Sequence, residues 1–479
     1  DDIGVFVMQH GPGAENAFGG VAQSFSESVP ILVMPAGYVR RLAHYYPNFN
    51  STLNMKHITK WAEPLTMAKA LPEVMRRAFS QLRNGRPGPV LVEVPLDVFN
   101  EELPEDFEYF SAMGTKSAPA PEALDQAASV LASAKRPVIY AGQGIHYAKA
   151  WAELRELAER LQIPVTTSLE GKSAFPDDHP LALGTAGRAL PKTVRHFLDE
   201  ADVILGIGCS FALTAFGTRM PKDKTFIHAT LDPMDINKDI AIQYPLVGDA
   251  RLTLEGLLHR LPEKRTASYP LEKEISQVRE PWLAEWMPRL TSEETPISPY
   301  RVIWDLIHAV DLNNVIMTHD AGSPRDQLTP FWPSLQPLSY LGWGKTTQLG
   351  YGLGLAMGAK LARPDALCIN IWGDAAIGFT GMDFETAVRE RLPILSILLN
   401  NFSMAIELPI MEVATEKYRS TDISGNYAAM AEAFGGYGER VEDPKDIRAA
   451  IQRGIAATER GQPALLEFIT SKELALSME

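Results

Sequence analysis

The stretch Ala366–Ser403, ALCINIWGDAAIGFTGMDFETAVRERLPILSILLNNFS, predicts a strand, a helix and a second strand. Ala366–Trp372 and Pro393–Leu399 are apolar runs of strand length, which is typical of parallel strands covered on both faces. Between them, Met382–Arg391 shows helical spacing of apolar and charged residues. A unit of this length is a right-handed crossover, so its two strands should run parallel and end at one edge of a sheet.

Polar residues stand at the two strand ends, where open α/β sheets bind ligands. The first strand stops at Gly373-Asp374 and the second at Asn400-Asn401. The crossover should bring Asp374 and Asn401 side by side, and one carboxylate with one amide oxygen suits Mg²⁺. We therefore predict a magnesium site at this edge of the sheet.

Small residues around the carboxylate favour a diphosphate there. Gly373, Ala375 and Ala376 leave room for it to approach the backbone, and the following helix points its N-terminus at the same place. Taken separately, Asp374 could be only a helix cap and Asn400-Asn401 only a turn. Their occurrence at both ends of one crossover favours the metal and diphosphate interpretation.

These residues also carry a family resemblance. GDA at 373–375 followed by NN at 400–401 resembles the GDG…NN motif of thiamine diphosphate enzymes, with Ala375 in place of the last glycine. The resemblance implies that Asp374, Asn401 and the backbone carbonyl of Ser403 hold Mg²⁺, and that the diphosphate of the cofactor completes the shell.

The bulk composition excludes several classes of protein. A chain of 479 residues is too long for one core and suggests about three domains. The net charge is −14, with no lysine or arginine cluster, which argues against nucleic acid or an anionic membrane as a partner. No apolar stretch reaches the ~20 residues of a membrane span, and no signal peptide is recognised. Cys209 and Cys368 lie in apolar runs and are expected to be buried free thiols, which predicts a cytoplasmic protein.

The first part of the chain resembles the pyrimidine-binding domain of acetolactate-synthase-like enzymes. Gly11–Asn16, GPGAEN, is similar to their GPGATN segment, and RPGPV at 86–90 and EVPLDV at 93–98 match further elements. The resemblance covers nearly the whole chain. It implies an α/β protein with three doubly wound domains and mainly parallel sheets: pyrimidine-binding at 1–110, Rossmann-like middle at 121–262, and diphosphate-binding at 296–479. A small-residue and proline-rich linker at 111–121 separates the first two, and a charged helical connector at 265–295 precedes the third.

In this family the pyrimidine domain opens with a helix and a strand that carry a glutamate, which activates the aminopyrimidine ring. By alignment on GPGAEN this glutamate should lie some two dozen residues before Asp1, so the first domain lacks its N-terminal part here. Either a segment precedes Asp1 or the protein lacks the activator. We favour the first, because the sheet would otherwise lack an internal strand.

The turn after the first strand is expected to face the cofactor. His10 would sit at the carboxyl end of the strand Gly4–Met8 and contact substrate as an acid, a base or a polar group, or it is only a hydrogen-bonded turn histidine. Pro12 and Asn16 are expected among the cofactor contacts.

The middle domain leaves its ligand open. Ala141-Gly142-Gln143-Gly144 follows a predicted strand at 137–141, but a lone GxG is weak support for a nucleotide. Acetolactate synthases hold FAD in this domain and oxalyl-CoA decarboxylases hold ADP. The synthases place RFDDR where this chain has Cys209–Thr214, CSFALT, and this departure weakens the case for FAD. The domain could be purely structural.

The last domain carries the remaining predicted contacts. Leu349, beside Gln348 in a glycine-rich loop, aligns with the apolar residue that wedges beneath the bent cofactor, although it could be a core leucine. Met404-Ala405-Ile406-Glu407 replaces the family's common QGM, and the resemblance implies that this stretch lines the substrate side. Met404 and Ile406 are expected among the cofactor contacts. The acidic pairs Asp177-Asp178 and Glu293-Glu294 are predicted to be solvated surface.

The resemblance implies a homodimer or homotetramer that acts on a small 2-oxo acid or related carbonyl compound, with thiamine diphosphate and Mg²⁺, by decarboxylation or carboligation of the acetolactate synthase type. Alternatives on the same cofactor are a 2-hydroxyacyl-CoA lyase, an oxalyl-CoA decarboxylase or a diketone hydrolase. If the activator is truly absent, the chain could instead be a catalytically inactive, cofactor-binding paralogue.

Overall fold

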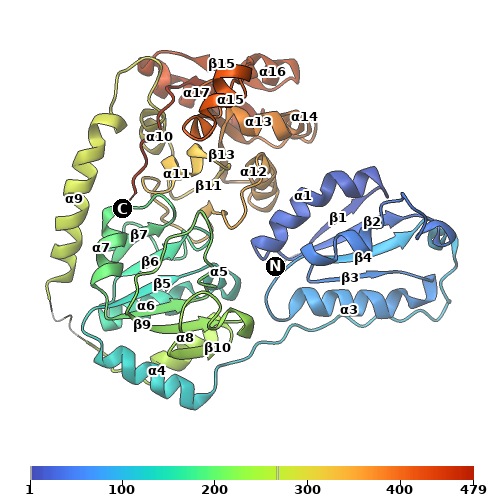
Figure 1. The fold of residues 1–479 in the computed structure, drawn as a ribbon, viewed down its shortest axis with the longest axis horizontal. Helices are drawn as coiled ribbons and strands as arrows, with labels where there is room; N and C mark the ends of the chain where they lie inside the picture. The colour runs from blue at the N-terminus through green and yellow to red at the C-terminus, as the bar shows by residue number, and fades with distance from the viewer. Residues whose placement is uncertain (1–2, 266, 268, 479) are drawn as a thin grey trace. The chain divides into compact units, whose positions relative to one another are not determined.

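The computed structural model describes residues 3–265, 267 and 269–478, and its chain divides into two compact units, Asp1–Ser117 and Ala118–Glu479 (Figure 1). The division falls inside the predicted linker at 111–121. Within the described residues there are three parallel sheets, which confirms the predicted α/β fold class. Asp1 and Asp2 of the predicted first domain, Thr266 and Ser268 of the predicted connector, and Glu479 lie outside the described residues.

The first unit contains one parallel sheet in the order β1-β2-β4-β3. Its strands are β1 (Gly4–Met8), β2 (Ile31–Gly37), β3 (Trp61–Pro64) and β4 (Val90–Pro95), and its helices are α1 (Pro12–Ser26), α2 (Ser51–Asn54) and α3 (Leu71–Arg83). α1 and α3 contribute to two different apolar clusters of this unit. Gly11 has a φ of 60°, and Pro12 starts α1 where a missing N–H costs nothing. The GPG turn thus makes a sharp change from strand to helix.

The second unit begins with a doubly wound sheet in the order β10-β9-β8-β5-β6-β7. Its strands are β5 (Pro137–Ala141), β6 (Val165–Ser168), β7 (Ala182–Ala186), β8 (Val203–Ile207), β9 (Thr225–Thr230) and β10 (Tyr244–Val247). Its helices are α4 (Pro121–Ser133), α5 (Gly144–Ala148), α6 (Trp151–Leu161), α7 (Lys192–Glu200) and α8 (Ala250–Leu258), and α9 (Leu271–Leu290) leads on to the next sheet. β5, β6 and β8 are buried throughout. This explains the apolar sequences of β5 and β8, since helices cover both faces of a parallel sheet.

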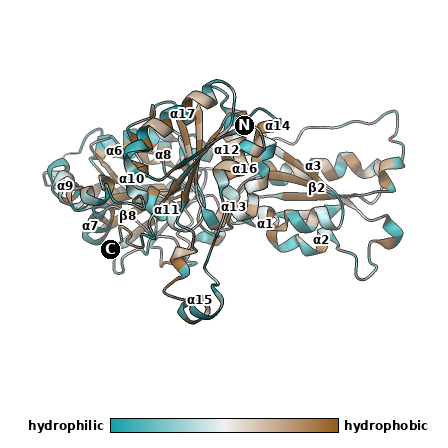
Figure 2. Cartoon of the chain, turned by 90° about the horizontal axis from the view of Figure 1, so that it is seen from above, coloured by the Kyte–Doolittle hydropathy of each residue, from teal (hydrophilic) through white to brown (hydrophobic). Residues whose placement is uncertain are grey.

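The third sheet, also in the second unit, has the order β12-β11-β13-β14-β16-β15. Its strands are β11 (Val315–His319), β12 (Tyr340–Leu341), β13 (Leu367–Gly373), β14 (Leu395–Asn400), β15 (Tyr437–Val441) and β16 (Ala464–Ile469). Its helices are α10 (Pro299–Ile307), α11 (Ser323–Leu328), α12 (Tyr351–Ala362), α13 (Asp374–Thr380), α14 (Phe384–Arg389), α15 (Glu412–Tyr418), α16 (Tyr427–Ala433) and α17 (Ile447–Glu459). Apolar side chains fill both faces of this sheet, and α15 projects away from it (Figure 2).

The crossover between β13 and β14 differs from the expected single helix. The chain turns into α13 directly at Asp374, passes through a 3-10 turn at Gly381–Asp383, and continues as α14. The helical pattern predicted at 382–391 covers only the second half, because the short side chains of 374–378 carry no periodic signal. Both strands and their parallel pairing are as predicted.

Polar contacts join the second and third sheets. Asp177 accepts hydrogen bonds from Lys172 Nζ at 2.8 Å and from the backbone N–H of Ser334 at 2.9 Å. The prediction that Asp177 is solvated surface is therefore wrong, because the connection is made to a residue far away in the sequence.

Among the described residues, no helix combines the length and apolar character that a membrane crossing requires.

Candidate cofactor and metal site

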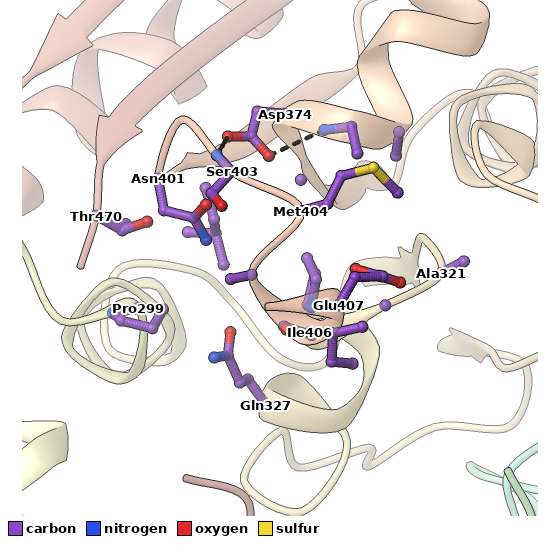
Figure 3. A pocket seen from close by; sticks show the side chains of 18 of the residues that line it. Pro299, Ala321, Gln327, Asp374, Asn401, Ser403, Met404, Ile406, Glu407 and Thr470 are labelled. Atoms are coloured by element: carbon purple, nitrogen blue, oxygen red, sulfur yellow. Dashed lines mark hydrogen bonds between the residues drawn. The ribbon is translucent and has the colours of Figure 1, made fainter. Parts of the chain in front are cut away.

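The crossover brings the ends of β13 and β14 side by side. Gly373 pairs in register with Leu399, so the residues that follow both strands lie at one edge of the sheet. Asp374 begins α13, and Asn401 and Ser403 lie in the loop after β14. Figure 3 shows these three side chains at one end of a pocket.

Asp374 is fixed by two backbone groups. Its Oδ2 accepts a hydrogen bond from the N–H of Ser403 at 3.0 Å, and its Oδ1 accepts one from the N–H of Ala375 at 2.9 Å (Figure 3). Burial raises the pKa of this carboxyl from 3.8 to about 6, although these N–H groups act in the opposite direction. Asp374 therefore does more than cap a helix: it connects the ends of two strands and places a partly desolvated carboxylate between them.

Two oxygen atoms beside Asp374 lack a protein partner. Asn401 Oδ1 and Ser403 Oγ are buried and accept no hydrogen bond from the described residues. The Ser403 carbonyl accepts the N–H of Ala405 at 2.8 Å and keeps a second lone pair. Buried polar atoms are normally satisfied, so this set of hard oxygens fits a metal ion with a phosphate ligand.

Asn400, which precedes Asn401, has a structural role. Asn400 is fully buried; its Nδ2 donates to Glu467 Oε1 at 2.7 Å and its Oδ1 accepts the N–H of Phe402 at 3.0 Å. Glu467 Oε2 also accepts the N–H groups of Tyr427 and Ala428, at 3.0 Å each, at the start of α16. Asn400 thus forms the turn that the alternative interpretation expected, and this turn leaves Asn401 at the pocket.

The pocket encloses about 580 Å³, part of it open to solvent. Most of the predicted contacts of this domain line it, namely Leu349, Gly373, Asp374, Ala375, Ala376, Asn401, Ser403, Met404 and Ile406. Gln348 is exposed and does not line it. The cofactor role predicted for Gln348 gains no support from this pocket.

Several lining residues were not predicted, among them Pro299, Gln327, Thr470 and Ser471. Thr470 and Ser471 follow the end of β16, which pairs with β14. A search for polar residues after every strand of this sheet could have found them. Pro299 and Gln327 lie at α10 and in α11, and their sequence surroundings carry no comparable signal.

The loop that carries Leu349 is held by a second buried carboxylate. Asp320 Oδ1 accepts the N–H groups of Gly350 at 2.9 Å and Ala321 at 2.8 Å, and its Oδ2 accepts that of Gly352 at 3.0 Å. A Cβ on Gly352 would lie 2.4 Å from the backbone oxygen of His319, so only glycine allows this approach. Burial raises the pKa of Asp320 to about 6. This network fixes the position of Leu349 at the pocket.

Asp320→Asn is expected to flatten the pH dependence of stability. The folded-state pKa of Asp320 lies above its unfolded value. The contribution of Asp320 to the free energy of unfolding is therefore fully present below about pH 4 and is lost as the pH rises through about 6. A shift of this size corresponds to roughly 2–3 kcal/mol between these limits. Melting temperatures from pH 4.5 to 7.5, with exposed Asp365→Asn as the control, would show it. An unchanged slope in Asp320→Asn would contradict this account.

The remaining predicted site residues lie in the first unit. His10 follows β1, and its ring lies edge-on to that of Tyr38, with 4.7 Å between the ring centroids. His10 Nδ1 is buried without a hydrogen-bond partner among the described residues. Pro12 and Asn16 are exposed on the first turns of α1. His10 Nδ1 therefore makes no turn hydrogen bond with the described residues.

The middle domain does not fit a dinucleotide held by its glycine turn. The N–H groups of Gly142 and Gly144, which would face a phosphate, donate to the carbonyls of Ile207 at 2.9 Å and Gly208 at 2.7 Å. A Cβ on Gly142 would lie 2.4 Å from the Gly208 oxygen, so the two loops meet backbone to backbone. Phe211, in the segment that departs from the family pattern, turns inward and stacks on Tyr140 at 5.5 Å. The described residues thus support neither FAD nor ADP at this turn.

Comparisons with known proteins agree with this geometry. Residues 124–257 match the family "Thiamine pyrophosphate enzyme, central domain", and residues 320–468 match "Thiamine pyrophosphate enzyme, C-terminal TPP binding domain". A probable acetolactate synthase large subunit of Methanocaldococcus jannaschii is 29% identical, over 100% of this chain and 83% of its own length. The acetolactate synthase isozyme 3 large subunit of Escherichia coli is 27% identical, over 95% of this chain and 81% of its own.

The fold has a solved counterpart. The crystal structure of benzoylformate decarboxylase from Polynucleobacter necessarius superposes with a TM-score of 0.82, covering 98% of this chain and 88% of that one, at 20% sequence identity. At this level of sequence identity, the comparison shows a shared fold only.

Proposed function

Since the chain belongs to the thiamine pyrophosphate enzymes and is of the acetolactate synthase type, we propose that it decarboxylates a 2-oxo acid with thiamine diphosphate and Mg²⁺. The remaining fragment is then protonated or joined to a second carbonyl compound. The observation that carries this proposal is the buried Asp374 carboxylate beside the unpartnered oxygens of Asn401 and Ser403. The pocket gives room for a ligand next to this metal site.

The residues take distinct roles in this proposal. Asp374, Asn401 and the Ser403 carbonyl hold the metal, and Gly373, Ala375 and Ala376 bring backbone close to the diphosphate. Leu349, Met404 and Ile406 supply the apolar wall, with Gln348, Pro12 and Asn16 as further cofactor contacts. Thiamine diphosphate supplies, when bound, a nucleophilic carbon and an electron sink. The protein orients the substrate beside it and limits the access of water.

We assign His10 to the substrate. Its half-buried ring has an unpartnered Nδ1, which can donate to or accept from a carbonyl or hydroxyl oxygen, depending on the tautomer. His10→Ala is expected to lower kcat by about tenfold or more while the Kd of thiamine diphosphate stays within about twofold. Steady-state rates measure kcat and calorimetry measures the Kd of thiamine diphosphate, with exposed His44→Ala as the control. An unaltered rate would remove His10 from the site.

The proposal also includes an oligomeric state and a cellular location. A homodimer or homotetramer is supported by large apolar side chains exposed on the third domain, among them Phe379 (68%) and Ile410 (82%). Light scattering during gel filtration would give the mass. A cytoplasmic location is supported by the free thiols of Cys209 and Cys368. The domain ranges 1–110, 121–262 and 296–479 remain predictions, and each contains one of the three sheets.

Two measurements test the proposed function. Calorimetric titration of thiamine diphosphate with and without Mg²⁺ should show binding only with the metal. Steady-state rates across a panel of 2-oxo acids, acyl-CoA thioesters and diketones should then be highest with a 2-oxo acid. Absence of cofactor binding would refute the proposal, and preference for an acyl-CoA or a diketone would select one of the alternative reactions. Binding without turnover would identify a cofactor-binding paralogue.

A further inference from the structure

Helix α11 has one side at the pocket and the other side buried. Ser323, Pro324 and Gln327 line the pocket, and Figure 3 shows Gln327 there. Arg325 and Asp326 are only 1% and 3% exposed, and neither of them lines the pocket. A helix of six residues is not stable by itself, so its position depends on what packs against it.

The pocket side of α11 touches the turn that presents the proposed metal ligand. Gly373 ends β13, and Asp374 begins α13. A Cβ placed on Gly373 would lie 3.6 Å from Pro324 Cγ, which is an ordinary van der Waals distance. The Pro324 ring therefore lies against this turn, and a displacement of α11 would leave the Asp374 carboxylate less well fixed.

The buried side of α11 is held by the middle domain. Arg325 donates from Nε to Asp326 Oδ1 at 2.7 Å and from Nη2 to Asp326 Oδ2 at 3.0 Å. The centre of the Phe216 ring lies 4.6 Å from the guanidinium carbon of Arg325, and Arg188 Nη1 lies 3.8 Å from Asp326 Oδ2. Cation–π and ionic attractions are strongest between groups withdrawn from water, so these two contacts should fix the helix to the middle domain.

Arg188 and Phe216 come from two loops that are joined to each other. Arg188 follows β7, and Phe216 lies in the loop between β8 and β9. Gly187 and Gly217 form an antiparallel bridge, and Thr218 Oγ1 donates to the Gly187 carbonyl at 2.7 Å. The middle domain thus presents both side chains to α11 as one preformed surface.

We propose that Arg188 and Phe216 are positioning residues for the metal site. They hold the buried side of α11, and α11 in turn fixes the turn at Gly373-Asp374. The middle domain, whose glycine turn is closed by backbone contacts, thereby acts on cofactor binding without binding a nucleotide. This inference rests on the proposed function, because the turn affects the cofactor only if Asp374 holds Mg²⁺.

The first test removes each contact separately. Phe216→Leu and Arg188→Gln are each expected to raise the Kd of thiamine diphosphate, measured with saturating Mg²⁺, by about fivefold. Neither side chain lines the pocket, and the Arg325–Asp326 pair stays intact in both variants. Arg188→Lys keeps the charge and should restore most of the affinity. Arg155→Gln, which removes an exposed ion pair on α6 of the same domain, should change the Kd by less than about twofold.

A double-mutant cycle separates positioning from a general loss of stability. Pro324→Ala removes the ring that contacts Gly373. In this background Phe216→Leu should raise the Kd further by less than about twofold, because the connection to the metal turn is already lost. Hydrogen exchange needs no cofactor: in the ligand-free Phe216→Leu protein the amides of α11 should exchange about tenfold faster, while those of α17 keep the rate of the unmodified protein.

These measurements distinguish the two proposals. Unchanged cofactor affinity in both Phe216→Leu and Arg188→Gln, or an equal effect of Phe216→Leu with and without the Pro324 ring, would overturn the positioning role. Failure of the unmodified protein to bind the cofactor would instead refute the proposed function, and the exchange rates of α11 would still show whether the middle domain holds this helix. If Phe216→Leu does not fold, Arg188→Gln takes its place in the cycle and in the exchange experiment.

Discussion

Asp374→Ala is expected to abolish Mg²⁺-dependent binding of thiamine diphosphate, raising its Kd by at least about 100-fold, or about 2.7 kcal/mol. Asp374 contributes the only carboxylate among the three proposed metal ligands. Without it, Asn401 and the Ser403 carbonyl offer Mg²⁺ no negative charge. Titration of the cofactor by calorimetry, with and without Mg²⁺, measures the loss.

The fold should survive this substitution. Burial raises the pKa of Asp374 to about 6, so the ionised carboxylate is costly in the ligand-free protein at neutral pH. Circular dichroism and the melting temperature of the ligand-free variant should match those of the unmodified chain. Asp383→Ala, an exposed acid on the same crossover, is the control. Unchanged cofactor affinity in Asp374→Ala would refute the metal assignment.

Glu467→Gln is expected to lower the unfolding free energy of the third domain by about 3 kcal/mol. The buried Glu467 carboxylate satisfies Asn400 Nδ2 and the N–H groups of Tyr427 and Ala428. A glutamine has one acceptor oxygen, and its NH₂ group would point at donors. The melting temperature should fall by several degrees, as followed by scanning calorimetry.

The same substitution should also weaken cofactor binding, because Asn400 holds the turn that presents Asn401. The Kd of thiamine diphosphate should rise in Glu467→Gln even below its melting temperature. Glu459→Gln, exposed at the end of α17, tests whether a charge change alone has either effect. A stable Glu467→Gln with unaltered affinity would show that this network does not organise the site.

The sequence alone determined the crossover at the centre of the protein. The apolar runs before Gly373 and Asn401 belong to β13 and β14, and their parallel pairing follows from the connection between them. The helix at 374–380 lies outside the helical pattern predicted at 382–391, because its small residues Ala375, Ala376 and Gly378 leave no periodic pattern. Strand 137–141 was predicted to the residue, since a strand buried on both faces of a parallel sheet forms a continuous apolar run.

Only the tertiary structure decided which polar groups meet. The two asparagines at 400 and 401 are identical in sequence terms, yet Glu467 binds the first and leaves the second at the pocket. Thr470 reaches this pocket from the end of β16, and Asp177 accepts a hydrogen bond from Ser334, a residue distant in the chain. Periodicity and spacing report what is local to one element. The partner of a buried polar side chain is chosen by the packing of elements far apart in sequence, and this information exists only once the sheet has assembled.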